Sequence, residues 1–133
     1  MLQPSGRNQS GQTAKSAEGW TIERLTPASR LQSANGIRTG ADGRIYVAQV
    51  AGSRVSAVDV DSGVIETISP SNGGIVGPDD LAFDDAGNLY CTEITEGRVS
   101  MMTPSGEYRV VHGDMPVANP ITYHQGRLIA GEL

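Results

Sequence analysis

Aromatic side chains, cysteine and long apolar runs are all scarce in this chain of 133 residues. Aromatic residues make up 5% of it, and its single cysteine, Cys91, excludes an internal disulfide framework and suits a reducing compartment. The sequence contains no stretch of about 18 apolar residues, the length needed to cross a membrane, and the N-terminus lacks the apolar core of a signal peptide. We therefore expect a soluble, cytoplasmic protein with no membrane partner.

Positive charge is also in short supply. Ten Lys and Arg residues face fifteen Asp and Glu residues, the net charge is −5, and the basic residues are scattered along the chain. This distribution argues against nucleic acid as a partner. Glycine and proline, in contrast, recur every few residues, and no window keeps a helical period, so the chain is expected to be turn-rich and all-β.

One phrase occurs three times and is headed by Asn35, Asp79 and Asn119, which lie 44 and 40 residues apart. Its clearest copy, residues 77–93, reads as strand, tight turn and strand. Apolar residues such as Leu81 alternate with smaller or polar ones before the turn, and an apolar run resumes after it. The chain is therefore a repeat.

A second phrase lies between the copies of the first. Arg54-Val55-Ser56 returns as Arg98-Val99-Ser100, again 44 residues later. Each full unit thus holds four short strands in a period in the low forties, which is the spacing of a β-propeller blade. The sequence predicts an all-β fold that forms part of a propeller.

The domain organisation follows from this repeat. Residues 1–19 have few large apolar side chains, and we expect a flexible N-terminal arm. Residues 20–133 are expected to form half a propeller: a strand over Trp20–Leu25, two full blades and the inner strand pair of a third blade. The segment Trp20–Leu25 is either the strand that seals the ring or a simple first strand.

About two and a half blades do not close a ring, since propellers have about four to eight blades. A sheet cut after its second strand also exposes a raw edge, which folded proteins avoid. The remaining blades of the ring could come from two sources. A second, different chain could be the C-terminal half of the same cleaved precursor, or two copies of this chain could form one ring. We favour the second chain, because an identical partner would complete the cut blade only by swapping strands.

Candidate functional residues lie where strand one of each repeat begins and strand two ends. Strand one leaves one face of the propeller and strand two returns to it, so both positions meet at the same mouth of the central channel. Asp79, Asp80, Glu93 and Glu132 are our candidate catalytic residues there, with Asn35, Gln49 and Asn119 beside them. Converging oxygens of this kind suit a hard cation such as Ca²⁺ or Mg²⁺, while singly they can simply stabilise turns.

The phrase Pro-Asp-Asp-Leu-Ala-Phe-Asp-x-x-Gly-Asn-Leu-Tyr at residues 78–90 and Gly-Arg-Leu-Ile-Ala-Gly at residues 126–131 resemble the senescence-marker-protein, gluconolactonase and luciferin-regenerating-enzyme family. The resemblance covers residues 20–133, about the first half of a member. It implies half of a six-bladed propeller, metal-dependent lactonase or related hydrolase activity, and one axial divalent cation. The matching ligand positions are Asn35, Asp79 and Asn119. The family's first ligand is usually a Glu, which Asn35 replaces here.

We therefore hypothesise a subunit of a hydrolase that acts on the carbonyl of a small lactone, ester or amide. Its partner would be the C-terminal half-propeller chain, and a Thr, Ser or Cys that begins that chain would act as an N-terminal nucleophile. A metal-dependent lactonase or lyase with an axial Ca²⁺ or Mg²⁺, and a binding propeller without catalysis, are the alternatives.

Overall fold

The computed structural model of the chain describes residues 15–26 and 31–133. These residues form ten strands in three antiparallel sheets, with no helix among them and hence none that could span a membrane. The first sheet holds β1 (Ala34–Thr39), β2 (Ile45–Gln49), β3 (Arg54–Val58) and β4 (Ile65–Ser69); the second holds β5 (Pro78–Phe83), β6 (Leu89–Glu93), β7 (Arg98–Met102) and β8 (Tyr108–His112); the third holds β9 (Ala118–His124) and β10 (Arg127–Glu132).

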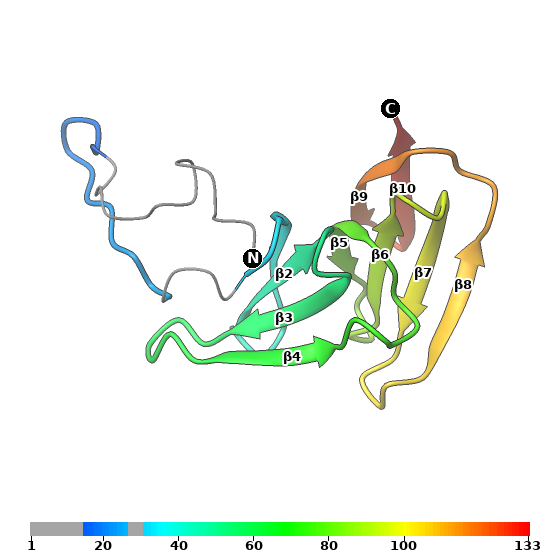
Figure 1. The fold of residues 1–133 in the computed structure, drawn as a ribbon, viewed down its shortest axis with the longest axis horizontal. Coiled ribbons are helices and arrows are strands. Elements are labelled where there is room, and N and C mark those ends of the chain that lie inside the picture. Colours follow the sequence, from blue (N-terminus) through cyan, green and yellow to red (C-terminus); the bar gives the residue numbers. More distant parts are fainter. Residues whose placement is uncertain (1–14, 27–30) are drawn as a thin grey trace, which may run out of the picture.

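The three sheets follow one another in chain order, as Figure 1 shows, and each strand pairs with its sequence neighbour. The first strand of each sheet lies innermost, and β5 contacts both β1 and β9. This arrangement confirms the predicted partial propeller with two four-stranded blades and the inner strand pair of a third. Each repeat of the sequence therefore corresponds to one sheet of the structure.

The turn chemistry that the repeats carry is visible between β5 and β6. The Asp84 carboxylate accepts hydrogen bonds from the backbone N–H groups of Ala86 and Asn88, at 3.0 and 2.9 Å, and from the Tyr90 hydroxyl at 3.0 Å. Gly87 has a φ of 81°, a conformation that costs other residues energy. One carboxylate thus fixes both the turn and the start of the next strand.

Apolar side chains pack between the sheets rather than within them. One cluster joins the first two sheets, where the rings of Tyr46 and Phe83 meet edge to face with centroids 4.8 Å apart. A second cluster around Val99 and Ile121 joins the second and third sheets. Cys91 lies fully buried in the first cluster, and burial raises the pKa of its thiol well above the usual range. This cysteine is therefore a packing residue and a poor nucleophile.

Trp20–Leu25 forms no strand in the described chain, which holds no last blade for a sealing strand to pair with, so the strand predicted there stays a prediction. These residues pair with no strand of the described chain, and Trp20 is 75% exposed. Alternation of apolar residues makes a strand only where a neighbouring backbone offers hydrogen bonds, and nothing described here does so. Residues 1–14 of the predicted arm lie outside the described residues, and residues 15–19 are exposed.

The Asp84 turn leads to a prediction about acid stability. Burial would raise the pKa of Asp84, but hydrogen bonds from Asn88 and Tyr90 outweigh it and lower the pKa below the usual value. A carboxylate with a lowered folded pKa stabilises the fold above the unfolded pKa of about 3.9, and this contribution is lost as pH falls. We expect Asp84→Asn to flatten the acid limb of the unfolding free energy, measured in urea from about pH 6 to about pH 3. Identical acid limbs in both proteins would contradict this role.

Candidate functional site

An extra residue sits in the innermost strand of all three sheets, at the same end. The pairing advances by three residues on the inner strand while it advances by two on its partner, so a β-bulge interrupts each ladder. The bulges contain Asn35, Asp79 with Asp80, and Asn119. Because bulges redirect side chains and recur next to active sites, this repeated feature defines the candidate site.

The register also shows which residues lie opposite one another at the bulged end of each inner strand pair. Ala34 lies opposite Gln49, Pro78 opposite Glu93, and Ala118 opposite Glu132. Each opening residue of an inner strand is therefore close to the last residue of its neighbour. Sequence period alone was sufficient for this part of the prediction.

Asn35 and Asp79 come together across two blades. The Asn35 Nδ2 group donates to Asp79 Oδ1 at 2.6 Å, and Asp79 is only 4% exposed. Within the described chain, Asp79 Oδ2 and Asn35 Oδ1 accept no hydrogen bond. The pair thus presents one oriented carboxylate with a free oxygen.

In Asp80, the next residue, both carboxylate oxygens accept hydrogen bonds from the backbone. Its Oδ1 accepts the N–H of Leu81 at 2.9 Å, and its Oδ2 accepts the N–H of Ile121, on the neighbouring blade, at 3.0 Å. Arg38 of the first blade lies 3.4 Å away and also donates to the carbonyls of Leu81 and Ile121, at 2.9 and 3.3 Å. We call Arg38 and Asp80 the axial clasp, because together they join β1, β5 and β9.

Sequence reasoning missed Arg38. The repeats place Ala82 and Thr122 at its equivalent positions, so an arginine there is a departure from the pattern. That departure was the available signal. A charged residue that replaces small ones inside an inner strand needs a long-range partner.

Thr92 positions the third bulge. Its hydroxyl donates to the Asn119 carbonyl at 2.6 Å and accepts the Asp80 N–H at 3.1 Å, and the residue is fully buried. The Asn119 side chain takes part in no hydrogen bond within the described residues and is half-buried. Its amide therefore remains available at the mouth.

Glu93 lies at the mouth end of β6 but points into the blade. Its side chain has no exposed surface; Oε2 accepts two hydrogen bonds from Arg98, at 2.9 and 2.7 Å, and one from the Val76 N–H, while Oε1 accepts the Tyr108 hydroxyl. Glu93 raises the pKa of Arg98. These contacts give Glu93 a structural role, because they tie β6 to β7 and β8. The carboxylate of Glu93 is therefore not accessible to a substrate. Glu132, in contrast, is exposed.

The predicted cation ligands can be tested by their free oxygens. Asn35, Asp79 and Asn119 each keep a side-chain oxygen without a hydrogen-bond donor in the described chain. Oxygen donors are what Ca²⁺ and Mg²⁺ take, but three are fewer than the six or so that these ions require. No group of three His, Cys, Asp or Glu residues suited to a metal occurs among the described residues. The three side chains offer oxygen donors of the right kind, but too few to form a cation site by themselves.

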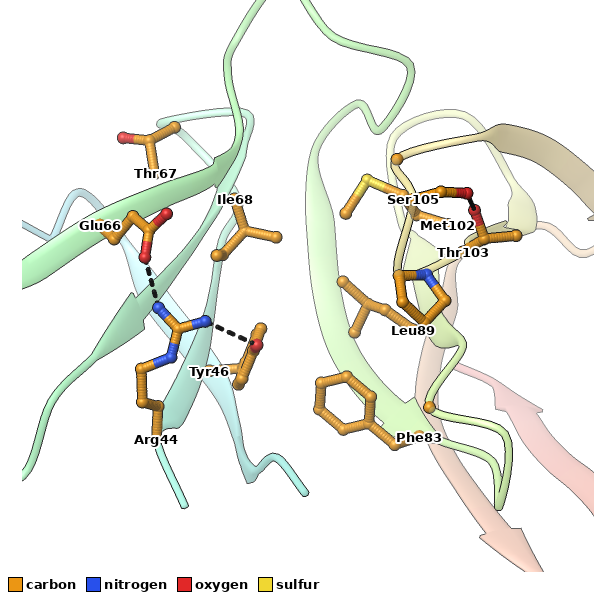
Figure 2. A pocket seen from close by; sticks show the side chains of 13 residues that line it. Arg44, Tyr46, Glu66, Thr67, Ile68, Phe83, Leu89, Met102, Thr103 and Ser105 are labelled. Carbon is orange, nitrogen blue, oxygen red and sulfur yellow. Dashed lines mark hydrogen bonds and ion pairs between the residues drawn. The ribbon is translucent and has the colours of Figure 1, made fainter. Parts of the chain in front are cut away.

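A cleft lies between the first and second sheets, at the end of the blades opposite to the bulges. This cleft of about 400 Å³ is shown in Figure 2, with Arg44, Tyr46 and Glu66 on one wall and Phe83 and other apolar residues on the facing wall. Arg44 pairs with Glu66 and donates to the Tyr46 hydroxyl at 3.2 Å. The polar groups of this cleft thus form hydrogen bonds with one another. The bulged ends of the inner strands remain the better candidate for the functional site.

Comparisons with known proteins identify the class. No family model and no curated protein matches the chain. Solved structures that match include virginiamycin B lyase from Staphylococcus aureus, at 24% identity and a TM-score of 0.63 over 74% of this chain and 34% of that one. A streptogramin B lyase matches at 18% identity and a TM-score of 0.69, over 84% and 38%. The PQQ-bound aldose sugar dehydrogenase from Streptomyces coelicolor matches at 18% and 0.57, over 73% and 36%.

These similarities show the fold. The chain is part of a β-propeller and spans about a third of the length of the structures it matches. They do not single out the gluconolactonase-like family that the sequence resembles. Function must therefore be argued from the site.

The buried Glu93 pair gives a prediction that separates structure from catalysis. Glu93→Gln removes the charge that holds Arg98, and breaking a buried pair costs about 3–5 kcal/mol, so we expect a loss of about 2–4 kcal/mol because Arg98 is partly exposed. Urea unfolding measures it, with Glu107→Gln, an exposed turn residue, as the control. Normal stability in Glu93→Gln would return Glu93 to the catalytic candidates.

Proposed function

We propose that this chain is the N-terminal part of an enzymatic propeller that cleaves a lactone, ester or amide in a small molecule at the channel mouth. A second chain from the same precursor completes the ring. The observation that carries the proposal is the Asn35–Asp79 pair, set in a bulge that all three inner strands share.

Asp79 has the features of a general base. Its carboxylate is almost fully buried, one oxygen is oriented by Asn35, and the other is free within the described chain. A carboxylate held in this way can take a proton from water, which then attacks the carbonyl carbon. Asp80 and Arg38 fix the strands on either side, so Asp79 does not have to move when it takes the proton.

The neighbouring amides extend this site. Asn35 and Asn119 place polar groups on both sides of β5, where they can orient a bound carbonyl compound. A divalent cation held by Asn35, Asp79 and Asn119, together with ligands from the rest of the ring, would polarise that carbonyl.

A lyase reaction is the second candidate. Two of the matching solved structures are named as lyases, and the same base could remove a proton from carbon instead of from water, so that the ester oxygen leaves by elimination. The products differ in one respect. Hydrolysis adds an oxygen atom from water, and elimination adds none.

For an amide substrate, the partner chain would supply the nucleophile. Strand β10 ends opposite the start of β9, so a chain that docks next to it would enter at the bulged end of the third sheet. An N-terminal Thr, Ser or Cys there could use its own amine as base. Asp79 would then act on the leaving group.

The test replaces Asp79 in the assembled propeller. Asp79→Asn keeps the shape and the Asn35 contact but removes the base, so we expect a loss of about 10²–10⁴ in kcat on a panel of small lactones and esters, with unchanged unfolding. Asp114→Asn, in an exposed loop, is the control. Full activity combined with a loss of stability would show that Asp79 is only a turn residue.

The same active preparation distinguishes the two reactions when it is assayed in ¹⁸O-labelled water. Hydrolysis predicts one labelled oxygen in each acid product. Unlabelled product together with a new carbon–carbon double bond would support the lyase reaction instead.

A further inference from the structure

The cleft between the first and second sheets lies apart from the bulges, and both of its walls come from four-stranded sheets. One wall holds Tyr46 of β2 and Ile68 of β4, and the facing wall holds side chains of β5, β6 and β7, as Figure 2 shows. The volume of about 400 Å³ falls in the range of about 300–1,000 Å³ that is typical of small-molecule sites. The cleft is therefore large enough to hold a small molecule.

The wall on the second sheet is apolar. Phe83, Leu89 and Met102 are cross-strand neighbours by register, so their side chains stand on the same face of the sheet. Phe83 and Met102 remain half-buried, although both pack against the core cluster that joins the two sheets. Among the described residues that line the cleft, those of the second sheet carry no charge. This wall suits the apolar part of a ligand.

The charged groups of the other wall are centred on Arg44, which has two carboxylates as partners. Its Nε donates to Asp42 at 2.7 Å, and its Nη1 donates to Glu66. The hydrogen bond to Asp42 is the largest cause of the raised pKa of Arg44, and the one to Glu66 contributes less. One positive and two negative groups leave this cluster with a net charge of −1.

Asp42 is a structural member of this cluster. It also accepts a hydrogen bond from the Tyr46 hydroxyl at 3.0 Å, and the second sheet contains the same kind of contact between Tyr90 and Asp84, also at 3.0 Å. Because both sheets join a tyrosine to a turn aspartate, this contact belongs to the fold. Asp42 is therefore the fixed partner that offsets the charge of Arg44.

Glu66 carries the charge that remains. Its side chain is 63% exposed, Oε2 accepts the hydrogen bond from Arg44, and Oε1 accepts none from any described residue. The repeat does not require an acid at this position. Glu66 lies opposite Ala57 on β3, and the equivalent position opposite Met101 on β7 holds Arg109. One carboxylate oxygen at the edge of the cleft is thus available to a bound cation.

We propose that this cleft binds a small organic amine in its protonated form. The ammonium group donates a charge-assisted hydrogen bond to Oε1 of Glu66, and the apolar body of the amine packs against Phe83 and Met102. An organic anion would meet the surplus negative charge, and an inorganic cation would leave the apolar wall uncovered. The cleft lies at the end of the blades opposite to the bulges, so this inference does not rest on the proposed function.

Two adjacent methionines provide the reporter for a binding experiment. Met102 lines the cleft, and Met101, which precedes it on β7, is buried on the opposite face of the sheet. The protein is labelled with ¹³C at the methionine methyl groups and titrated with 2-phenylethylammonium at neutral pH, and the methyl signals are followed by NMR. We expect the Met102 signal to shift until it saturates, while the Met101 signal stays in place.

Probes that differ in one property test each part of the ligand. 2-Phenylethanol is neutral, 3-phenylpropionate is an anion, and methylammonium is a cation without an apolar body. We expect 2-phenylethylammonium to bind about fivefold more tightly than 2-phenylethanol, which is the factor that an ion pair with a partly exposed carboxylate can contribute, and the other two probes to bind more weakly still. Equal binding of the ammonium ion and the alcohol would overturn the proposal. These comparisons use the unmodified protein, so they do not depend on whether a variant folds.

Glu66→Gln is the matched change in the protein. It keeps the shape of the side chain and removes its charge, so the preference for 2-phenylethylammonium over 2-phenylethanol should disappear. Asp61→Asn removes an exposed charge from the turn between β3 and β4, outside the cleft, and should preserve the preference. A preference that survives Glu66→Gln, that both variants lose alike, or a Met102 signal that no probe moves would overturn the proposal.

Discussion

The axial clasp is the contact on which the rest of the structure depends. The three sheets share no backbone ladder, so the inner strands are held together by side chains. Arg38 reaches two carbonyls and one carboxylate on the next two blades, and Asp80 accepts a backbone N–H from the blade that follows. These charged groups lie where the blades converge, and their hydrogen bonds are directional. They set the spacing of the blades more narrowly than apolar packing alone would.

The clasp also explains why adjacent aspartates differ so much. The bulge gives β5 an extra residue, and successive side chains at that point face different neighbours. Both carboxylate oxygens of Asp80 accept backbone N–H groups. Asp79 accepts a hydrogen bond from Asn35 through one oxygen, and its other oxygen accepts none within the described chain. For the proposed reaction, a frame of this kind would hold Asp79 in position before a substrate binds, which favours acid–base catalysis.

Most of the fold could be predicted from the sequence, because its main signal is periodic. From the spacings of 44 and 40 residues we could predict the sheets and the strand pairs that the structure has. What was missed depends on contacts between distant residues: the contacts of Arg38 with the next two blades and the burial of Glu93 against Arg98. Alternation and position in the repeat indicate which way a side chain can point. Contacts with the neighbouring blade determine whether its polar atoms form structural hydrogen bonds or remain without a partner.

The most direct test of the central claim, that this chain is one part of a propeller closed by a partner, is mass spectrometry of the natively purified protein. Denaturing and native spectra are recorded on the same sample. We expect a second polypeptide in the denaturing spectrum and a one-to-one complex in the native one. A single species of 133 residues that stays monomeric and stable would contradict the claim.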